Sequence, residues 1–124
     1  MTALGWVHEI MKNGLYSMHV RTLDGHFGKG SGVLVFRDGT LLGGDAFLYY
    51  TGSYTTDGTT LKGELLIDQH TQPRDVAPLF GGRPVSIGFS GKIGDTEATV
   101  GGTALFGKQS IRLAATLRRV ADLD

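Results

Sequence analysis

Apolar and polar residues alternate along most of this chain. Within residues 109–120, the apolar residues Ile111, Leu113, Ala115 and Leu117 alternate with polar and charged ones. A period of two places one side of a β-strand in a core and the other side in solvent. Similar patterns predict strands over residues 15–23, 28–37, 40–42, 47–55, 60–71, 85–92, 96–106 and 109–120.

Short turns separate the predicted strands. Asp-Gly pairs occur at residues 24–25, 38–39 and 57–58, and this dipeptide is typical of the two-residue turn of an antiparallel hairpin. Residues 73–84 contain all three prolines and predict a loop across one end of the fold, with one helical turn near residues 77–80. We therefore expect an all-β fold, a small antiparallel up-and-down β-barrel of about seven or eight strands. A sandwich is the alternative, and tight hairpins between successive strands favour the barrel.

Glycine is unusually frequent, with 20 residues in a chain of 124, which is more than double the average usage of about 7%. Glycines inside strands let those strands bend enough to close a barrel. We interpret residues 30–32 as a β-bulge and residues 101–102 as a bulge or a bend. We interpret Gly43, Gly44 and Asp45 as a structural turn, in which the glycines adopt positive φ and the carboxylate bonds to local backbone.

Charge and residue types argue against several functions. The 12 basic residues balance the 12 acidic ones, whereas nucleic-acid binding normally needs a basic excess or stripe, so we expect no nucleic-acid partner. The chain has no cysteine, which excludes a disulfide framework and a thiolate zinc site. The histidines lack the sequence spacing of a metal site, and we interpret them as surface residues: His8, His19, His26 and His70. We expect neither a bound metal nor a cofactor.

Sequence motifs for catalysis are also missing. The chain contains no Gly-x-Ser-x-Gly elbow, and residues 28–32 lack the spacing of a phosphate-binding loop. We therefore expect a protein that is not an enzyme; a hydrolase or isomerase at the barrel mouth would require clustered titratable groups with perturbed pKa values. The N-terminus lacks the pattern of a secretion signal, and no stretch approaches the roughly 18 apolar residues of a membrane span. These features predict a cytoplasmic protein that does not contact a membrane.

Three tyrosines occur within residues 47–55. The alternation predicts that Tyr49 and Tyr50 point to opposite faces and that Tyr54 shares the face of Tyr50. Together with Asp57 in the following turn, they are candidates for a ligand or partner surface. The alternative is ordinary packing of aromatic side chains, since an eight-stranded barrel can either be filled by side chains or hold one small ligand.

The run Met-Lys-Asn-Gly-Leu-Tyr-Ser at residues 11–17 resembles the opening of the GrlR family, the negative regulators of type III secretion. The similarity continues through the glycine-rich second strand, residues 38–39, residues 42–45 and residues 50–54, and it spans about residues 11–71. From Pro73 onward it is looser and depends on the order of the strands. The resemblance implies a lipocalin-like barrel of the calycin type, a homodimer, and regulation by protein binding.

The characterised relative sequesters a transcriptional activator through a surface motif of alternating Glu and Asp residues. The corresponding hairpin here covers residues 55–60 and carries one carboxylate, Asp57, so this chain departs from the family at that contact. The resemblance also makes residues 1–10 an N-terminal extension to a single barrel domain of residues 11–124. We expect a non-enzymatic regulatory protein that binds a transcriptional regulator; the alternative is a carrier or sensor of a small apolar ligand in the barrel interior.

Overall fold

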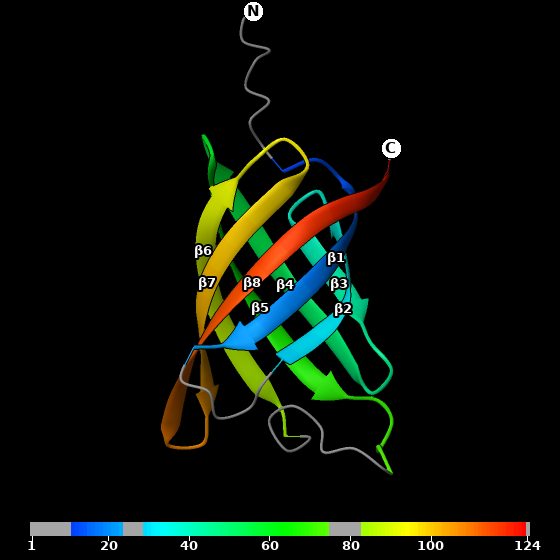
Figure 1. The fold of residues 1–124 in the computed structure, drawn as a ribbon, viewed down its shortest axis with the longest axis vertical. Coiled ribbons are helices and arrows are strands. Elements are labelled where there is room, and N and C mark those ends of the chain that lie inside the picture. Colours follow the sequence, from blue (N-terminus) through cyan, green and yellow to red (C-terminus); the bar gives the residue numbers. More distant parts are fainter. Residues whose placement is uncertain (1–10, 24–28, 75–82, 124) are drawn as a thin grey trace, which may run out of the picture.

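The computed structural model describes residues 11–23, 29–74 and 83–123, which form a closed β-barrel (Figure 1). Its strands are β1 (Gly14–Thr22), β2 (Lys29–Arg37), β3 (Thr40–Gly44), β4 (Leu48–Asp57), β5 (Thr60–Gln69), β6 (Val85–Ile93), β7 (Glu97–Phe106) and β8 (Gln109–Asp122). Each strand pairs antiparallel with the next in sequence, and β8 pairs with β1 to close the barrel. The expected all-β up-and-down barrel is confirmed.

The described residues contain no helix. Several expectations fall on residues that lie outside the described ranges. These are the helical turn near 77–80, the course of the proline-containing loop over 75–82, the Asp-Gly turn at 24–25, the extension over 1–10, and the positions of His8 and His26.

Two-residue turns join three of the hairpins. Asp38 and Gly39 both have positive φ, 47° and 88°, which is the type I′ geometry that matches the twist of paired strands. Gly58 and Gly107 have φ values of 62° and 61° at the first position of the turns between β4 and β5 and between β7 and β8. The predicted hairpin turn at residues 38–39 is confirmed. The turn predicted at residues 57–58 lies one residue later, at residues 58–59, because Asp57 is the last residue of β4.

Side-chain alternation assigns the two faces of the barrel as expected. On β8, Leu113 and Leu117 are buried, whereas Arg112 and Arg118 are exposed. The same pattern on the other strands places a continuous set of apolar side chains in the interior, including Met18, Leu34, Leu41, Leu48, Leu65, Ile67, Val85, Ile87, Ala98 and Ala104. These residues bury their apolar surface together, which is the main stabilising contribution to a fold of this kind.

An aromatic cluster fills the interior toward the end where β1 begins. The ring of Phe36 lies 4.9 Å from that of Tyr16 and 5.0 Å from that of Tyr54, measured between centroids. The Tyr16 hydroxyl donates a hydrogen bond to the carbonyl oxygen of Lys12 at 2.7 Å. We call Tyr16, Phe36 and Tyr54 the aromatic plug, because their rings occupy the space between the strands at this end.

The segments that we expected to be bulges are regular strand. Strand β2 pairs with β1 without a register shift at residues 30–32, and β7 pairs with both neighbours without a shift at residues 101–102. Two of their glycines instead relieve crowding: a Cβ on Gly32 would lie 2.9 Å from the carbonyl oxygen of Gly44, and a Cβ on Gly102 would lie 2.9 Å from the carbonyl oxygen of Gly88. A register shift occurs between Leu15 and Tyr16, where β1 pairs with β8.

Candidate functional site

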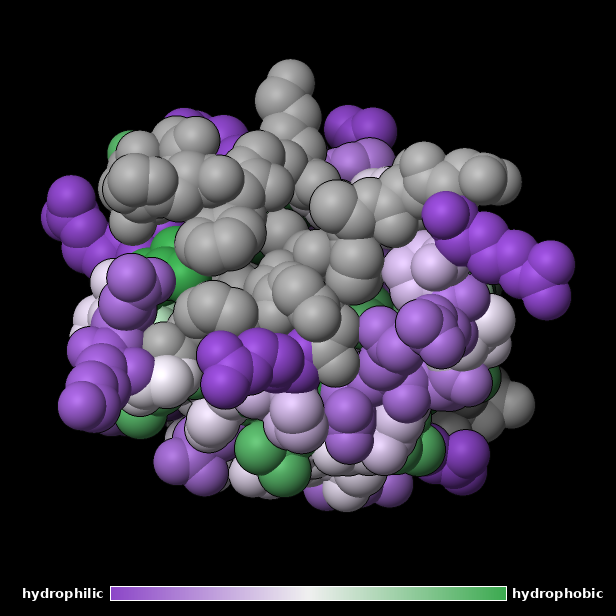
Figure 2. Space-filling model, turned by 90° about the horizontal axis from the view of Figure 1, so that it is seen from below, coloured by the Kyte–Doolittle hydropathy of each residue, from purple (hydrophilic) through white to green (hydrophobic). Residues whose placement is uncertain are grey.

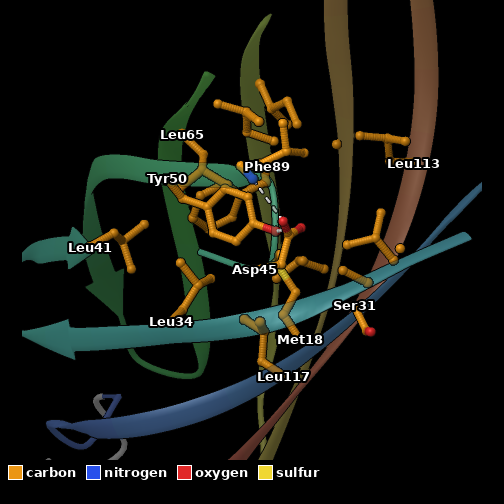
Figure 3. Close-up of a pocket in the computed structure, with 18 of the residues that line it drawn as sticks. Met18, Ser31, Leu34, Leu41, Asp45, Tyr50, Leu65, Phe89, Leu113 and Leu117 are labelled. Carbon is orange, nitrogen blue, oxygen red and sulfur yellow. Dashed lines mark hydrogen bonds between the residues drawn. The ribbon is translucent and has the colours of Figure 1, made fainter. Parts of the chain in front are cut away.

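The barrel interior that the aromatic plug leaves unfilled holds a cavity of about 450 Å³. Each of the eight strands contributes to its lining, with Met18, Leu34, Leu41, Tyr50, Leu65, Phe89, Val100 and Leu113 as one example from each strand (Figure 3). The lining is mainly apolar, and the volume falls within the roughly 300–1,000 Å³ typical of ligand pockets. The interior therefore has room for one small molecule.

Figure 2 views the barrel from the end where β1 finishes and where the cavity lies. The described side chains around this end are mostly hydrophilic, with hydrophobic ones visible at a few places between them. On the inside, the cavity walls at this half of the barrel carry apolar side chains such as Met18, Leu48 and Ile67.

Asp45 brings a carboxylate into this apolar surrounding. It follows the end of β3, and its Oδ1 atom accepts hydrogen bonds from the backbone N–H groups of Phe47 and Leu48 at 2.9 and 2.8 Å. Its Oδ2 atom accepts a hydrogen bond of 2.6 Å from the hydroxyl of Tyr50. Because donors from the loop and from β4 converge on it, the carboxylate is held in one orientation beside the Tyr50 ring, as Figure 3 shows.

Tyr50 is buried on the inner face of β4, with 3% of its surface exposed. Burial raises the pKa of its hydroxyl well above the ordinary value of 10.0, and both the hydrogen bond to Asp45 and the charge of that carboxylate raise the pKa further. The phenol therefore stays neutral, and its proton remains in the hydrogen bond to Asp45.

Gly32 provides the space that Tyr50 occupies. A Cβ at position 32 would lie 2.8 Å from the Tyr50 hydroxyl oxygen and 2.9 Å from the carbonyl oxygen of Gly44. These separations are shorter than van der Waals contact, so a side chain at this position would displace the tyrosine or the backbone of β3. Gly32 on β2 thus permits the contact between Tyr50 on β4 and the Asp45 carboxylate after β3.

We expect Gly32→Ala to lower the free energy of unfolding by about 1–3 kcal/mol, because an added methyl group overpacks this contact. Tyr50→Phe removes the hydroxyl oxygen, the nearest of the three atoms that the methyl group would meet, so the double variant should lose less stability than the sum of the two single variants. Chemical denaturation of the three variants measures this difference. Gly88→Ala is the matched control, since a Cβ there would meet nothing within 4 Å, and additive losses would contradict the assigned contact.

The loop that carries Asp45 is tied to the end of β5. The backbone N–H groups of His70 and Thr71 both donate to the carbonyl oxygen of Phe47, at 2.9 and 3.2 Å. The Nε2 atom of His70 lies 3.0 Å from the carbonyl oxygen of Asp45, and its Nδ1 atom lies 2.7 Å from Oγ1 of Thr71. Because a carbonyl oxygen can accept a hydrogen bond but not donate one, this contact requires the proton of His70 to be on Nε2.

The structure separates the four residues that we considered as a ligand or partner surface. Tyr50 lines the cavity, and Tyr54 belongs to the aromatic plug. Tyr49 lies on the outer face with 42% of its surface exposed, and Asp57 is exposed at the end of β4. They therefore do not form one surface, and of the four only Tyr50 lines the cavity.

Gly43 and Gly44 lie within strand β3 and not in a turn, and neither has a positive φ, unlike in our interpretation of the sequence. Glycine is required at these positions because neighbouring strands of the barrel approach closely: a Cβ on Gly43 would collide with the carbonyl oxygen of Val33 on β2. Asp45 alone begins the turn, and its carboxylate bonds to the local backbone N–H groups of Phe47 and Leu48.

We expect the stability of the protein to decrease as the pH rises above about 10. Burial raises the pKa values of Tyr16, Tyr50 and Tyr54 above 10.0 in the folded state. Above that pH the unfolded chain loses phenolic protons that the folded chain retains, so the folded state loses stability with increasing pH. The slope should be at most about 1.4 kcal/mol per pH unit for each such tyrosine.

Chemical denaturation at a series of pH values on both sides of 10 measures this slope. Tyr50→Phe removes one contribution and should make the decrease shallower. Tyr49→Phe is the control, because it removes a hydroxyl from an exposed ring. Equal slopes in the wild type and Tyr50→Phe would contradict the burial and the hydrogen bond assigned to Tyr50.

Sequence reasoning did not identify Asp45 as a residue of the cavity. The available signal was its position, five residues before an inward-facing tyrosine on the next strand. To recognise that Asp45 and Tyr50 meet, one must also know that Gly32 on β2, two strands away from β4, leaves space for the Tyr50 hydroxyl. Neither position suggests a binding site when taken alone.

Among the described residues, no group of three or more His, Asp or Glu side chains could hold a metal ion. The same residues include no helix with the length and apolar character needed to cross a membrane. Comparisons with known protein families and with curated proteins find no match.

Proposed function

We propose that this protein binds one small, mainly apolar molecule inside its barrel and acts as a non-enzymatic carrier or sensor of that molecule. The observation that carries this proposal is the cavity of about 450 Å³, with apolar side chains from all strands in its walls. Removing apolar surface from water contributes roughly 25 cal/mol per Å². A molecule that fills this space would therefore gain affinity from desolvation alone.

The proposal is tested with Nile red, an uncharged dye whose fluorescence increases in apolar surroundings. We expect saturable binding with one site per chain. Ala115→Phe places a ring in the cavity, which Ala115 lines from β8, and it should weaken dye binding by about tenfold or more. No saturable binding to the wild type would overturn the proposal.

Ala114→Phe is the matched control for this experiment. Ala114 is the preceding residue of β8 and lies on the opposite face of the strand, so the same substitution leaves the cavity unchanged. Circular dichroism and chemical denaturation establish that both variants fold. If the two variants bind the dye with equal affinity, the dye does not occupy the barrel interior.

A second candidate function is regulation by protein binding, with the protein acting as a homodimer and a transcriptional regulator as its partner. The resemblance of residues 11–71 to the GrlR family motivates this candidate, and an apolar row on the outer face supports it. Leu42, Leu66 and Leu105 are 53%, 59% and 60% exposed. Leu42 and Leu66 pair with either side of Thr51, and Leu66 and Leu105 pair with either side of Ser86.

Three exposed leucines aligned across neighbouring strands offer apolar surface that a partner could cover. Leu66→Glu places a charge at its centre and should convert a dimer to monomers in analytical ultracentrifugation. It should also prevent the retention of a regulator that the wild type retrieves from native lysate. Ser90→Glu is the control, because Ser90 is exposed on β6 and lies outside this row. A wild type that is monomeric and retrieves no partner would exclude this second function.

A further inference from the structure

We propose that the cavity selects apolar molecules whose head group donates hydrogen bonds, such as a protonated amine or an alcohol, and rejects fatty-acid carboxylates. This inference depends on the proposed function, because it concerns the ligand of the same cavity. It follows from the charge, the hydrogen-bonding state and the fixed position of Asp45 and Tyr50.

The charge of the cavity lining disfavours an anionic head group. Among the described residues that line the cavity, Asp45 has the only ionisable acidic or basic side chain apart from the phenol of Tyr50. Ser31 also lines the cavity, but its side chain belongs to the exposed face of β2, and its oxygen points away from the cavity in Figure 3. An anionic head group would therefore meet a like charge in an apolar surrounding, where such repulsion is strong.

The side chains of Asp45 and Tyr50 offer a ligand hydrogen-bond acceptors and no free donor. A carboxylate offers about four acceptor positions and no donor. The Asp45 carboxylate receives three hydrogen bonds, from Phe47, Leu48 and Tyr50, so acceptor capacity remains. The single hydroxyl proton of Tyr50 is already donated to Asp45, so its oxygen offers an acceptor position to a ligand. The pair can accept hydrogen bonds from a ligand but has none to donate.

Hydrogen bonds and close packing hold these two acceptors in place. The Asp45 loop is tied to the end of β5 through the carbonyl oxygens of Asp45 and Phe47. Gly32 leaves the space in which the Tyr50 hydroxyl lies. Because the acceptors are held in place before a ligand arrives, binding does not require them to be ordered, and less affinity is lost to entropy. The two oxygens therefore form a prepared contact for one donor group at the end of an apolar molecule.

The experiment compares three ligands that share one alkyl chain and differ in the head group: decylamine, decanol and decanoate. Each displaces Nile red at neutral pH, where the amine is protonated and the acid is ionised, below the concentration at which it forms micelles. We expect decylamine and decanol to bind more tightly than decanoate, with decylamine ahead of decanoate by about tenfold or more. Decanoate that binds as tightly as decylamine overturns the inference.

Asp45→Asn tests whether the carboxylate causes this preference. It should reduce the ratio between decylamine and decanoate affinities by about tenfold, with a smaller effect on decanol. Asp57→Asn is the matched control, because it removes an exposed carboxylate from the hairpin at the far end of β4. An unchanged ratio in Asp45→Asn overturns the inference.

The outcomes separate the two proposals. If Nile red and the alkyl ligands bind but the head group has no effect, the cavity binds apolar molecules and the donor selectivity is wrong. If neither the dye nor any alkyl ligand binds, the proposed function is wrong and the selectivity falls with it. If Asp45→Asn does not fold, the ranking of the three ligands on the wild type still decides the matter.

Discussion

Leu113→Asp is expected to abolish folding, whereas Arg112→Asp is expected to be tolerated. Leu113 is 5% exposed and contacts the interior from β8. The substitution removes apolar contacts with an expected loss of about 2–5 kcal/mol and adds a buried charge without a cationic partner. The sum approaches the total stability of about 5–15 kcal/mol that is typical of a domain. Arg112 lies on the outer face of the same strand, where a carboxylate remains hydrated.

Circular dichroism and resistance to limited proteolysis measure this difference. Leu113→Asn separates the contribution of the charge from that of the lost apolar contacts, because asparagine has nearly the same size and shape as aspartate. We expect it to fold, with reduced stability. If Leu113→Asp and Arg112→Asp behave alike, the assignment of the two faces of β8 is wrong.

Asp45→Ala is expected to lower the free energy of unfolding by about 3 kcal/mol. It removes the acceptor of three hydrogen bonds, two from backbone N–H groups and one from Tyr50. A buried donor left without an acceptor loses about 1–3 kcal/mol, and the Tyr50 hydroxyl is such a donor. Asp45→Asn keeps an acceptor for the backbone and should lose less. Chemical denaturation at neutral pH gives the free energies of unfolding of the wild type, Asp45→Ala and Asp45→Asn.

Asp57→Ala is the control for this prediction, because an exposed substitution of this kind usually changes stability by less than about 0.5 kcal/mol. An Asp45→Ala variant as stable as Asp57→Ala would mean that the three hydrogen bonds contribute nothing net. Proton release measured on unfolding above pH 10 should also decrease in Asp45→Ala, because the hydrogen bond to Asp45 and the charge of its carboxylate help to raise the pKa of Tyr50.

The alternation of apolar and polar residues predicted the strands and their buried and exposed faces with little ambiguity. The positions of Leu113 and Arg112 follow from a period of two along one strand, and such a period requires no knowledge of the partner strands. The Asp38–Gly39 turn follows from the same kind of local rule, because both residues adopt the positive φ that the hairpin needs. The exact role of each glycine was less predictable, because a glycine within a strand is favoured both where a neighbouring strand crowds it and where a bulge occurs.

The candidate site was much less predictable than the fold. Tyr50 and Tyr54 have the same inward orientation and identical chemistry, yet one lines a cavity and the other joins the aromatic plug. Which of them meets Phe36 depends on the tilt of β2 against β4, two strands that do not pair with each other. The roles of Gly32 and Asp45 likewise depend on a contact with Tyr50, a residue of another strand.

The amino-acid sequence was sufficient to predict an antiparallel barrel, the face to which most strand side chains point, and several of the turns that connect the strands. These properties depend on the local conformation of a few consecutive residues. The cavity of about 450 Å³ in the interior and the contact of the Asp45 carboxylate with the Tyr50 hydroxyl at its wall became apparent only in the folded structure. The space left between side chains depends on how all of the strands bring them together, and no single segment of the chain contains that information.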